Sequence, residues 1–166
     1  MTEAPALLAL LAVAAGAAGL LNAIAGGGSF LTFPALVFAG VPPIAANATS
    51  AVAVCPGYLG SALGFRSELR EMAGHRLRTE VVIAAAGGIS GALLLLWTPA
   101  RLFSQIVPWL LLFATALFAL GPRLSATLAT GAGSPHPGWR SPGLYLVALY
   151  GGYFNGGLGI LLMALY

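Results

Sequence analysis

The few charged residues of this chain are unevenly distributed, and this distribution limits the possible folds more than any other feature. No charged residue lies in 4–65, 81–100, 102–122 or 141–166. Each stretch is long enough for a transmembrane helix, which needs about 20 apolar residues. Charged residues make up only 7% of the chain, whereas soluble domains carry roughly a quarter. The sequence therefore predicts an integral membrane protein.

Glycine and proline divide these stretches into shorter apolar segments. We expect helices at about 6–25, 30–39, 44–65, 81–97, 103–120 and 144–166. Whether the short second segment crosses the bilayer or turns back is open from the sequence. The prediction is an all-α, polytopic membrane protein with about five hydrophobic spans in one transmembrane domain, residues 1–166.

Arginine marks the loops that we expect on the cytoplasmic side of the cell membrane. Residues 66–80 and 122–142 are separated by two spans, so they lie on one side, and both carry arginine. The connection between those spans carries only Arg101. Arginine-rich loops favour the cytoplasmic side. We expect 66–80 to be a short polar loop with room for an interfacial helical turn. The net charge of +3 is too small and dispersed to indicate a nucleic-acid partner.

The first apolar helix is predicted to break at residues 26–29, where three glycines precede Ser29. Each glycine destabilises a helix interior by about 1 kcal/mol relative to alanine. Within lipid, the freed backbone groups must pair inside the protein or line a wet cavity. The broken segment should therefore face protein or water.

A similar motif occurs again near the end of the chain. Residues 25–31 and 155–161 each place a glycine-rich break between two apolar segments. Paired breaks of this kind indicate a transporter binding site, although two independent glycine-rich packing faces would look the same. We interpret 1–142 as a first repeat of about four spans and 143–166 as the opening of a second, incomplete repeat.

These motifs resemble a known family of membrane proteins. The run from Gly26 to Ser29, then Pro34, then residues 46–50 (Ala-Asn-Ala-Thr-Ser), is similar to the first half of the TauE/SafE (TSUP) family of probable sulfite exporters. Residues 151–163 resemble the opening of that family's second half, although Ala164 stands where the family usually has proline. The resemblance implies transport of sulfur-containing or organic anions, such as sulfite, sulfoacetate and related sulfonates. It also implies a further C-terminal half.

Backbone at the breaks can supply what an anion needs in the membrane. The predicted spans contain no Arg, Lys or His, but a helix N-terminus offers unpaired N–H groups and about half a positive charge. We expect both breaks to face one cavity near the bilayer midplane. The candidate substrate-binding residues are Gly26, Gly27, Gly28, Ser29, Asn47, Thr49, Ser50, Asn155, Gly156 and Gly157.

Other roles remain open for the polar candidates. Ser29 can cap its own helix, and Thr49 and Ser50 can bond back to the preceding turn. A buried Asn in lipid either links helices or meets ligand, which applies to Asn47 and Asn155.

Two alternative functions also follow from the sequence. Small residues four apart occur at Gly60 and Gly64 and again at Gly87 and Gly91, and such pairs let helices approach closely. They fit a non-transporting protein, or a remnant, that acts by helix association, including as a homo-oligomer. Thiosulfate-type uptake along a path lined by Cys55 is the other alternative.

Neither catalysis nor cofactor binding is expected. We find no Ser-His-Asp set, paired carboxylates or phosphate-binding loop in the sequence. His75, His136 and Cys55 are too far apart in sequence for a metal-binding motif. The predicted partners are the lipid bilayer and a small anion.

Overall fold

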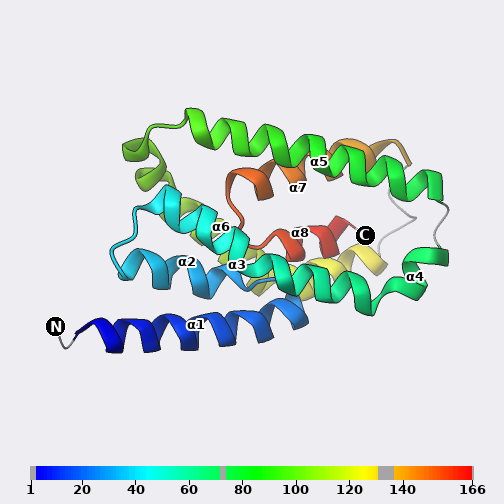
Figure 1. Cartoon of the computed structure of the whole chain (residues 1–166). Helices are drawn as coiled ribbons and strands as arrows, with labels where there is room; N and C mark the ends of the chain where they lie inside the picture. Colours follow the sequence, from blue (N-terminus) through cyan, green and yellow to red (C-terminus); the bar gives the residue numbers. More distant parts are fainter. Residues whose placement is uncertain (1–2, 72–73, 131–136, 166) are drawn as a thin grey trace.

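The computed structural model describes residues 3–71, 74–130 and 137–165, and its regular structure over these residues is entirely helical. The helices are α1 (Glu3–Ala25), α2 (Ser29–Phe38), α3 (Pro43–Gly64), α4 (Arg66–Glu71), α5 (Gly74–Trp97), α6 (Ala100–Thr130), α7 (Pro137–Tyr153) and α8 (Leu158–Leu165) (Figure 1). The prediction of an all-α membrane fold is confirmed.

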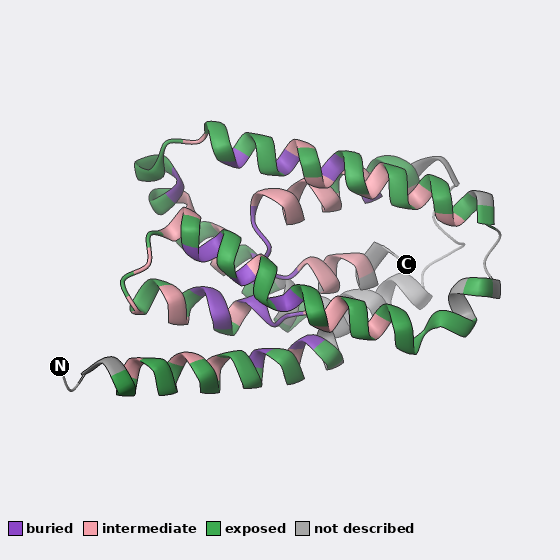
Figure 2. Cartoon of the chain, in the orientation of Figure 1, coloured by how far each residue is buried: buried purple, intermediate pink, exposed green. Residues whose placement is uncertain are grey.

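Two helices are long and apolar enough to cross a bilayer by themselves. They cover Pro5–Ala23 of α1, with a mean hydropathy of 2.1, and Arg76–Trp97 of α5, with a mean hydropathy of 1.9. Shorter apolar helical segments cover Ser29–Phe38 and Ala100–Ala116. Most residues of α1 and α5 are exposed, as Figure 2 shows, and they include large apolar residues, which suits helices whose solvent is lipid.

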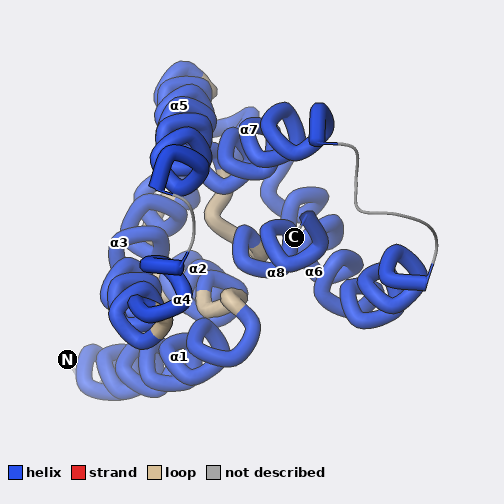
Figure 3. Tube along the Cα trace, turned by 90° about the vertical axis from the view of Figure 1, so that its right-hand side faces the viewer, coloured by secondary structure: helices blue, strands red, loops and turns tan. Residues whose placement is uncertain are grey.

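Both predicted helix breaks reverse the chain. After the first break α2 runs back along α1, and after the second break α8 runs back beneath α7 (Figure 1). The short second segment therefore turns back. Figure 3 looks along the bundle and shows α5 and α7 side by side. Helices α1, α2 and α3 form a separate group. Helix α8 lies between that group and α6.

Aromatic packing holds the second break against the first group of helices. The core contains Phe33 of α2, Phe103 of α6 and Phe154 of the second break, all buried. The rings of Phe33 and Phe154 meet edge to face, with centroids 5.4 Å apart. Edge-to-face contact is one of the two favoured arrangements of aromatic pairs.

The prediction of a short polar loop at 66–80 was wrong from residue 74 onward, whereas α4 corresponds to the helical turn for which that prediction left room. Six of these residues form α4, and α5 begins at Gly74. The helix brings Arg76 and Glu80 onto one face, where Nε and Oε1 are 3.3 Å apart, and Arg140 of α7 lies 3.9 Å from the same carboxylate oxygen. The charged residues Arg76 and Glu80 of this predicted loop therefore lie on helix α5, at its contact with α7.

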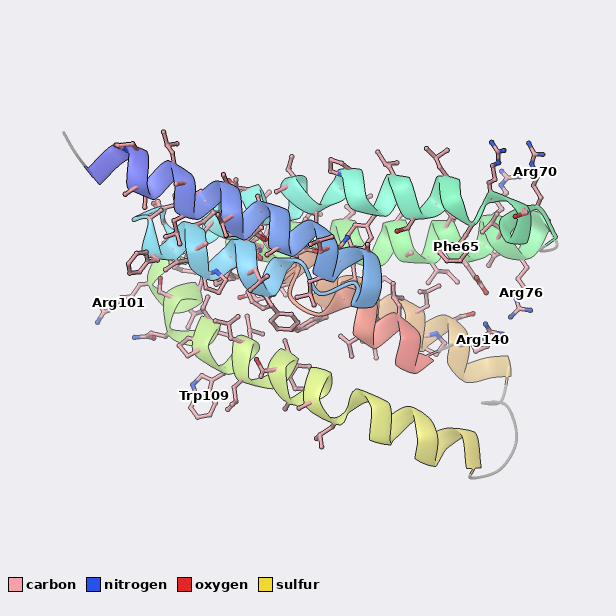
Figure 4. The ribbon with its side chains drawn as sticks, turned by 90° about the horizontal axis from the view of Figure 1, so that it is seen from below. Phe65, Arg70, Arg76, Arg101, Trp109 and Arg140 are labelled. Atoms are coloured by element: carbon pink, nitrogen blue, oxygen red, sulfur yellow. The ribbon has the colours of Figure 1, made fainter. Side chains whose placement is uncertain are left out.

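The loop predicted at 122–142 is also largely helical in the described residues. Helix α6 continues to Thr130, and α7 begins at Pro137. Figure 4 shows Arg70, Arg76 and Arg140 at one end of the bundle and Arg101 at the other. This placement agrees with the prediction that both arginine-bearing segments share a side. The cytoplasmic assignment of that side stays a prediction.

The two glycine pairs have different surroundings. A Cβ built at Gly91 would lie 2.0 Å from the Leu149 carbonyl oxygen, and one at Gly87 would lie 2.6 Å from that of Tyr145. The packing prediction is thus confirmed for α5, whose backbone approaches α7 closely. A Cβ at Gly60 or Gly64 would have no described atom within 4 Å outside its own helix backbone and chain neighbours.

Candidate functional site

The two glycine-rich breaks meet inside the bundle. Gly26 and Gly157 have φ angles of 65° and 77°, in the left-handed region that glycine adopts without steric cost. A Cβ built at Gly26 would lie 2.7 Å from the Cα of Gly159, and one at Gly159 would lie 2.6 Å from the Cα of Gly26. The backbones therefore touch directly, which any larger residue would prevent.

Asn155 links the second break to α2 and α3. Its Nδ2 donates to Ser29 Oγ at 3.0 Å, and its backbone N–H donates to Asn47 Oδ1 at 3.3 Å. Asn47 Nδ2 in turn donates to the Tyr153 carbonyl oxygen at 3.0 Å. Ser29, Asn47 and Asn155 are all buried. We call these three residues the Asn155 bridge.

A second polar group lies around Gly28. The Gly28 N–H donates to Asn22 Oδ1 at 3.4 Å, and Thr32 Oγ1 donates to the Gly28 carbonyl at 3.4 Å. The Thr32 hydroxyl also shares a hydrogen bond with Ser50 of α3. We call Asn22, Thr32 and Ser50 the Gly28 shell.

Sequence reasoning missed Asn22 and Thr32. Asn22 lies four residues before Gly26, and Thr32 lies three residues after Ser29, so each is one helical turn from a break. Helical spacing applied to polar residues on either side of the glycine run was the signal that would have found them.

The structure brings together nine of the ten candidate residues. Gly26, Gly27, Gly28 and Ser29 form the first break and its exit, and Asn155, Gly156 and Gly157 form the second. Asn47 and Ser50 of α3 point toward these breaks through the hydrogen bonds above.

Thr49 is the exception, because it is exposed. Successive helical residues are about 100° apart, so Thr49 projects from a different face of α3 than Asn47 and Ser50 do. The structure does not bring Thr49 into the cluster.

The structure decides between the alternative roles of Ser29 and Ser50. Helix α2 begins after Gly28 with no side-chain cap hydrogen bond, and Ser29 Oγ instead accepts from Asn155. Ser50 pairs with Thr32 across two helices, whereas Ser61 and Ser90 bond back to the carbonyl four residues earlier. Both serines of the site thus connect separate segments.

A cavity opens beside the breaks, between α1, α2 and α6. Its volume is about 360 Å³, and its lining residues are Leu21, Phe30, Pro34, Leu111 and Thr115. The Phe30 ring lies against Gly157, where an added Cβ would meet it at 3.3 Å. The lining is mostly apolar, so this cavity offers an anion few partners.

Cys55 and the potential metal ligands are the remaining candidates for chemistry. Cys55 is exposed on α3. No group of three or more potential metal-ligating side chains occurs among the described residues.

Comparisons with known proteins give the family. The sequence model of the sulfite exporter TauE/SafE family matches residues 11–166. The probable membrane transporter protein YfcA of Escherichia coli K12 is 36% identical over 121 residues, which cover 72% of this chain and 44% of that protein. The probable membrane transporter protein ORF9 of Sinorhizobium sp. is 38% identical over 122 residues, covering 71% of this chain and 45% of that protein.

The chain thus spans less than half the length of these relatives. No solved structure matches it. The family model covers nearly the whole sequence, including both glycine-rich breaks. This chain belongs to the sulfite exporter TauE/SafE family.

Proposed function

We propose that this protein takes part in moving sulfur-containing or organic anions, such as sulfite, sulfoacetate and related sulfonates, across the cytoplasmic membrane. Its family and the names of its relatives support a membrane transporter. The observation that carries the proposal is the direct contact between the two breaks, at Gly26 and Gly159.

Electrostatics favour an anion at this contact. Helices α2 and α8 both begin at the breaks, and the first N–H groups of a helix have no partner within that helix and carry partial positive charge. No charged residue lies between residues 4 and 65, so no carboxylate of α2 or α3 opposes an anion there. Glycine lets a ligand approach the backbone closely.

The proposed site lies deep in the membrane. In Figure 1 both reversals lie well inside the bundle, away from the connections at its two ends. Discontinuous helices that meet near the midplane are a common way for transporters to bind substrates. The Asn155 bridge holds the two breaks together and adds polar side chains at that depth.

Flux of labelled sulfite into proteoliposomes that contain this chain tests the proposal. We expect saturable uptake above that of empty liposomes. Gly27→Leu and Asn155→Leu should each abolish it, because the first fills a break and the second removes the bond to Ser29. Thr49→Val is the matched control and should keep the uptake. Flux that both break variants leave unchanged would refute the proposal.

One observation favours the alternative of helix association. Gly60 and Gly64 present an open face on α3, with no described atom near an added Cβ. A protein that acts only by association would bind a partner helix there and give no sulfite flux. The Cys55 alternative gains no such support, because that side chain is exposed.

A further inference from the structure

The exposed apolar side of α5 ends in an arginine. Four large apolar residues of α5 are exposed and share one helical register, namely Val82, Ile89, Leu93 and Leu96. Arg78 is also exposed and continues this register one turn before the first of them. The opposite register holds Gly87 and Gly91, which pack against α7. Arg78 therefore lies on the side of α5 that faces lipid.

Arg76 lies on the other side of the same helix. Its Nε is 3.3 Å from Glu80 Oε1, and Arg140 of α7 is 3.9 Å from the same oxygen. Among the side chains that the structure describes, the ion pairs at this end join these three residues and do not include Arg78. Helix α5 thus separates an arginine that connects two helices from an arginine that faces the membrane.

The exposed side of α3 also ends beside arginines. Three large apolar residues of α3 are exposed and share one helical register, namely Val52, Leu59 and Leu63. Phe65 follows directly after α3 and is 63% exposed. Apolar surface suited to acyl chains therefore extends up to the start of α4.

Helix α4 carries a pair of arginines on one side. Arg66 and Arg70 are exposed and four residues apart, so they share one side of this helix. The acidic residues Glu68 and Glu71 are not in this register. Figures 1 and 4 show α4, with Arg70, at the end of the bundle where α5 begins. The arginines of α4 and Arg78 therefore lie where the lipid-facing apolar surface stops.

Arginines at this level meet the phosphate groups of lipids. A guanidinium group forms bidentate, charge-assisted hydrogen bonds with phosphate. Phosphatidylcholine adds a cation that arginines repel, whereas phosphatidylglycerol carries only the negative charge of its phosphate. Each basic residue near an anionic membrane surface strengthens binding by about fivefold. The surface therefore favours an anionic lipid over a zwitterionic one.

We propose that Arg66, Arg70 and Arg78 form a binding surface for the headgroup phosphate of an anionic phospholipid, in the leaflet that this end of the bundle faces. The acyl chains of the lipid lie along the exposed apolar registers of α3 and α5. The bound headgroup holds α4 at the membrane surface. This surface is a lipid site at one end of the bundle, whereas the proposed transport site lies at the breaks in its interior.

Native mass spectrometry of the chain, released from neutral detergent micelles, tests this surface by counting bound lipids. The chain is first incubated with equimolar phosphatidylglycerol and phosphatidylcholine that have identical acyl chains. We expect wild type to bind phosphatidylglycerol at least about fivefold more than phosphatidylcholine. Arg78→Gln and the double variant Arg66→Gln/Arg70→Gln should each lower phosphatidylglycerol binding by about fivefold or more.

Arg101→Gln is the matched control. It removes the same charge at the other end of the bundle, where the α5–α6 connection has no second arginine. Phosphatidylglycerol binding should stay unchanged in this variant. Thermal unfolding in the same detergent shows that each variant is folded.

Equal binding of the two lipids by wild type would overturn the proposal without the use of any variant. An equal loss in Arg101→Gln and Arg78→Gln would also overturn it, because any arginine would then suffice.

A soluble competitor distinguishes a lipid from a free phosphate. Glycerol phosphate has the chemistry of the headgroup without acyl chains, and at the concentration of the lipid it should displace none. Displacement would contradict the proposal, because the arginines would then bind a soluble anion. Sulfite flux has no part in this test, so a failure here leaves the proposed transport function standing.

Discussion

At Asn47, Thr49 and Ser50 of α3, polar side chains close in sequence have different surroundings. Asn47 and Ser50 are buried and hydrogen bonded to other segments, whereas Thr49 is exposed. All three were candidates from the sequence, because the composition of a segment does not show which face of its helix is buried. Asn22 was missed although its spacing of four residues from Gly26 was a usable signal, whereas its packing against Gly57 of α3 cannot be read from the sequence.

Gly159 offers a test of the contact between the breaks at the level of one residue. Gly159→Ala would place a methyl group 2.6 Å from the Gly26 Cα, where only backbone can yield. Overpacking of this kind typically costs about 1–3 kcal/mol. We expect the free energy of unfolding, measured by SDS titration in mixed micelles, to fall by that amount. Gly60→Ala should not lower it, and an equal loss in both variants would contradict the contact.

At the scale of elements, glycine patterns predicted where helices break but not which helix faces are covered. The glycine-rich runs at 26–28 and 156–157 interrupt helices because their backbone cost is local. Whether a small-residue face is covered depends on distant segments. Gly87 and Gly91 of α5 meet α7, while the same spacing at Gly60 and Gly64 meets nothing described.

The packing of α5 against α7 can be tested within one helix. A Cβ at Gly91 would lie 2.0 Å from the Leu149 carbonyl oxygen, whereas one at Gly88 would have no neighbour within 4 Å. Gly91→Ala should therefore lower the thermal unfolding midpoint in detergent. Gly88→Ala should leave it unchanged or raise it, because alanine favours helix by about 1 kcal/mol. The reverse order would show that the two helices are not packed in this register.

At the scale of the whole molecule, the sequence predicted the membrane class, the helical fold and the pairing of the breaks. We predicted loops at 66–80 and 122–142, because charged and polar residues are typical of loops. The sequence does not show the helices against which these residues pack. The contacts of Glu80 with Arg76 and Arg140 explain how charge is accommodated on helices there. The reversal of α2 along α1 also depends on tertiary packing.

The orientation of the bundle yields a labelling prediction. The end that carries α4 should face the cytoplasm, and the α5–α6 connection should face outward. In a Cys55→Ser background, a membrane-impermeant thiol reagent applied to intact cells should label Thr98→Cys but not Ser67→Cys. Permeabilised cells serve as the control, in which both should react. Labelling of Ser67→Cys alone in intact cells would invert the assignment.

The central claim is that two separate breaks build one anion site, and sulfite-dependent stabilisation tests it most directly. A ligand at 100 times its Kd stabilises the folded state by about 2.7 kcal/mol. In lipid nanodiscs, sulfite should raise the unfolding midpoint of wild type and of Thr49→Val. It should do so for neither Gly27→Leu, in the first break, nor Asn155→Leu, in the second. A sulfite shift that survives in either break variant would contradict a shared site.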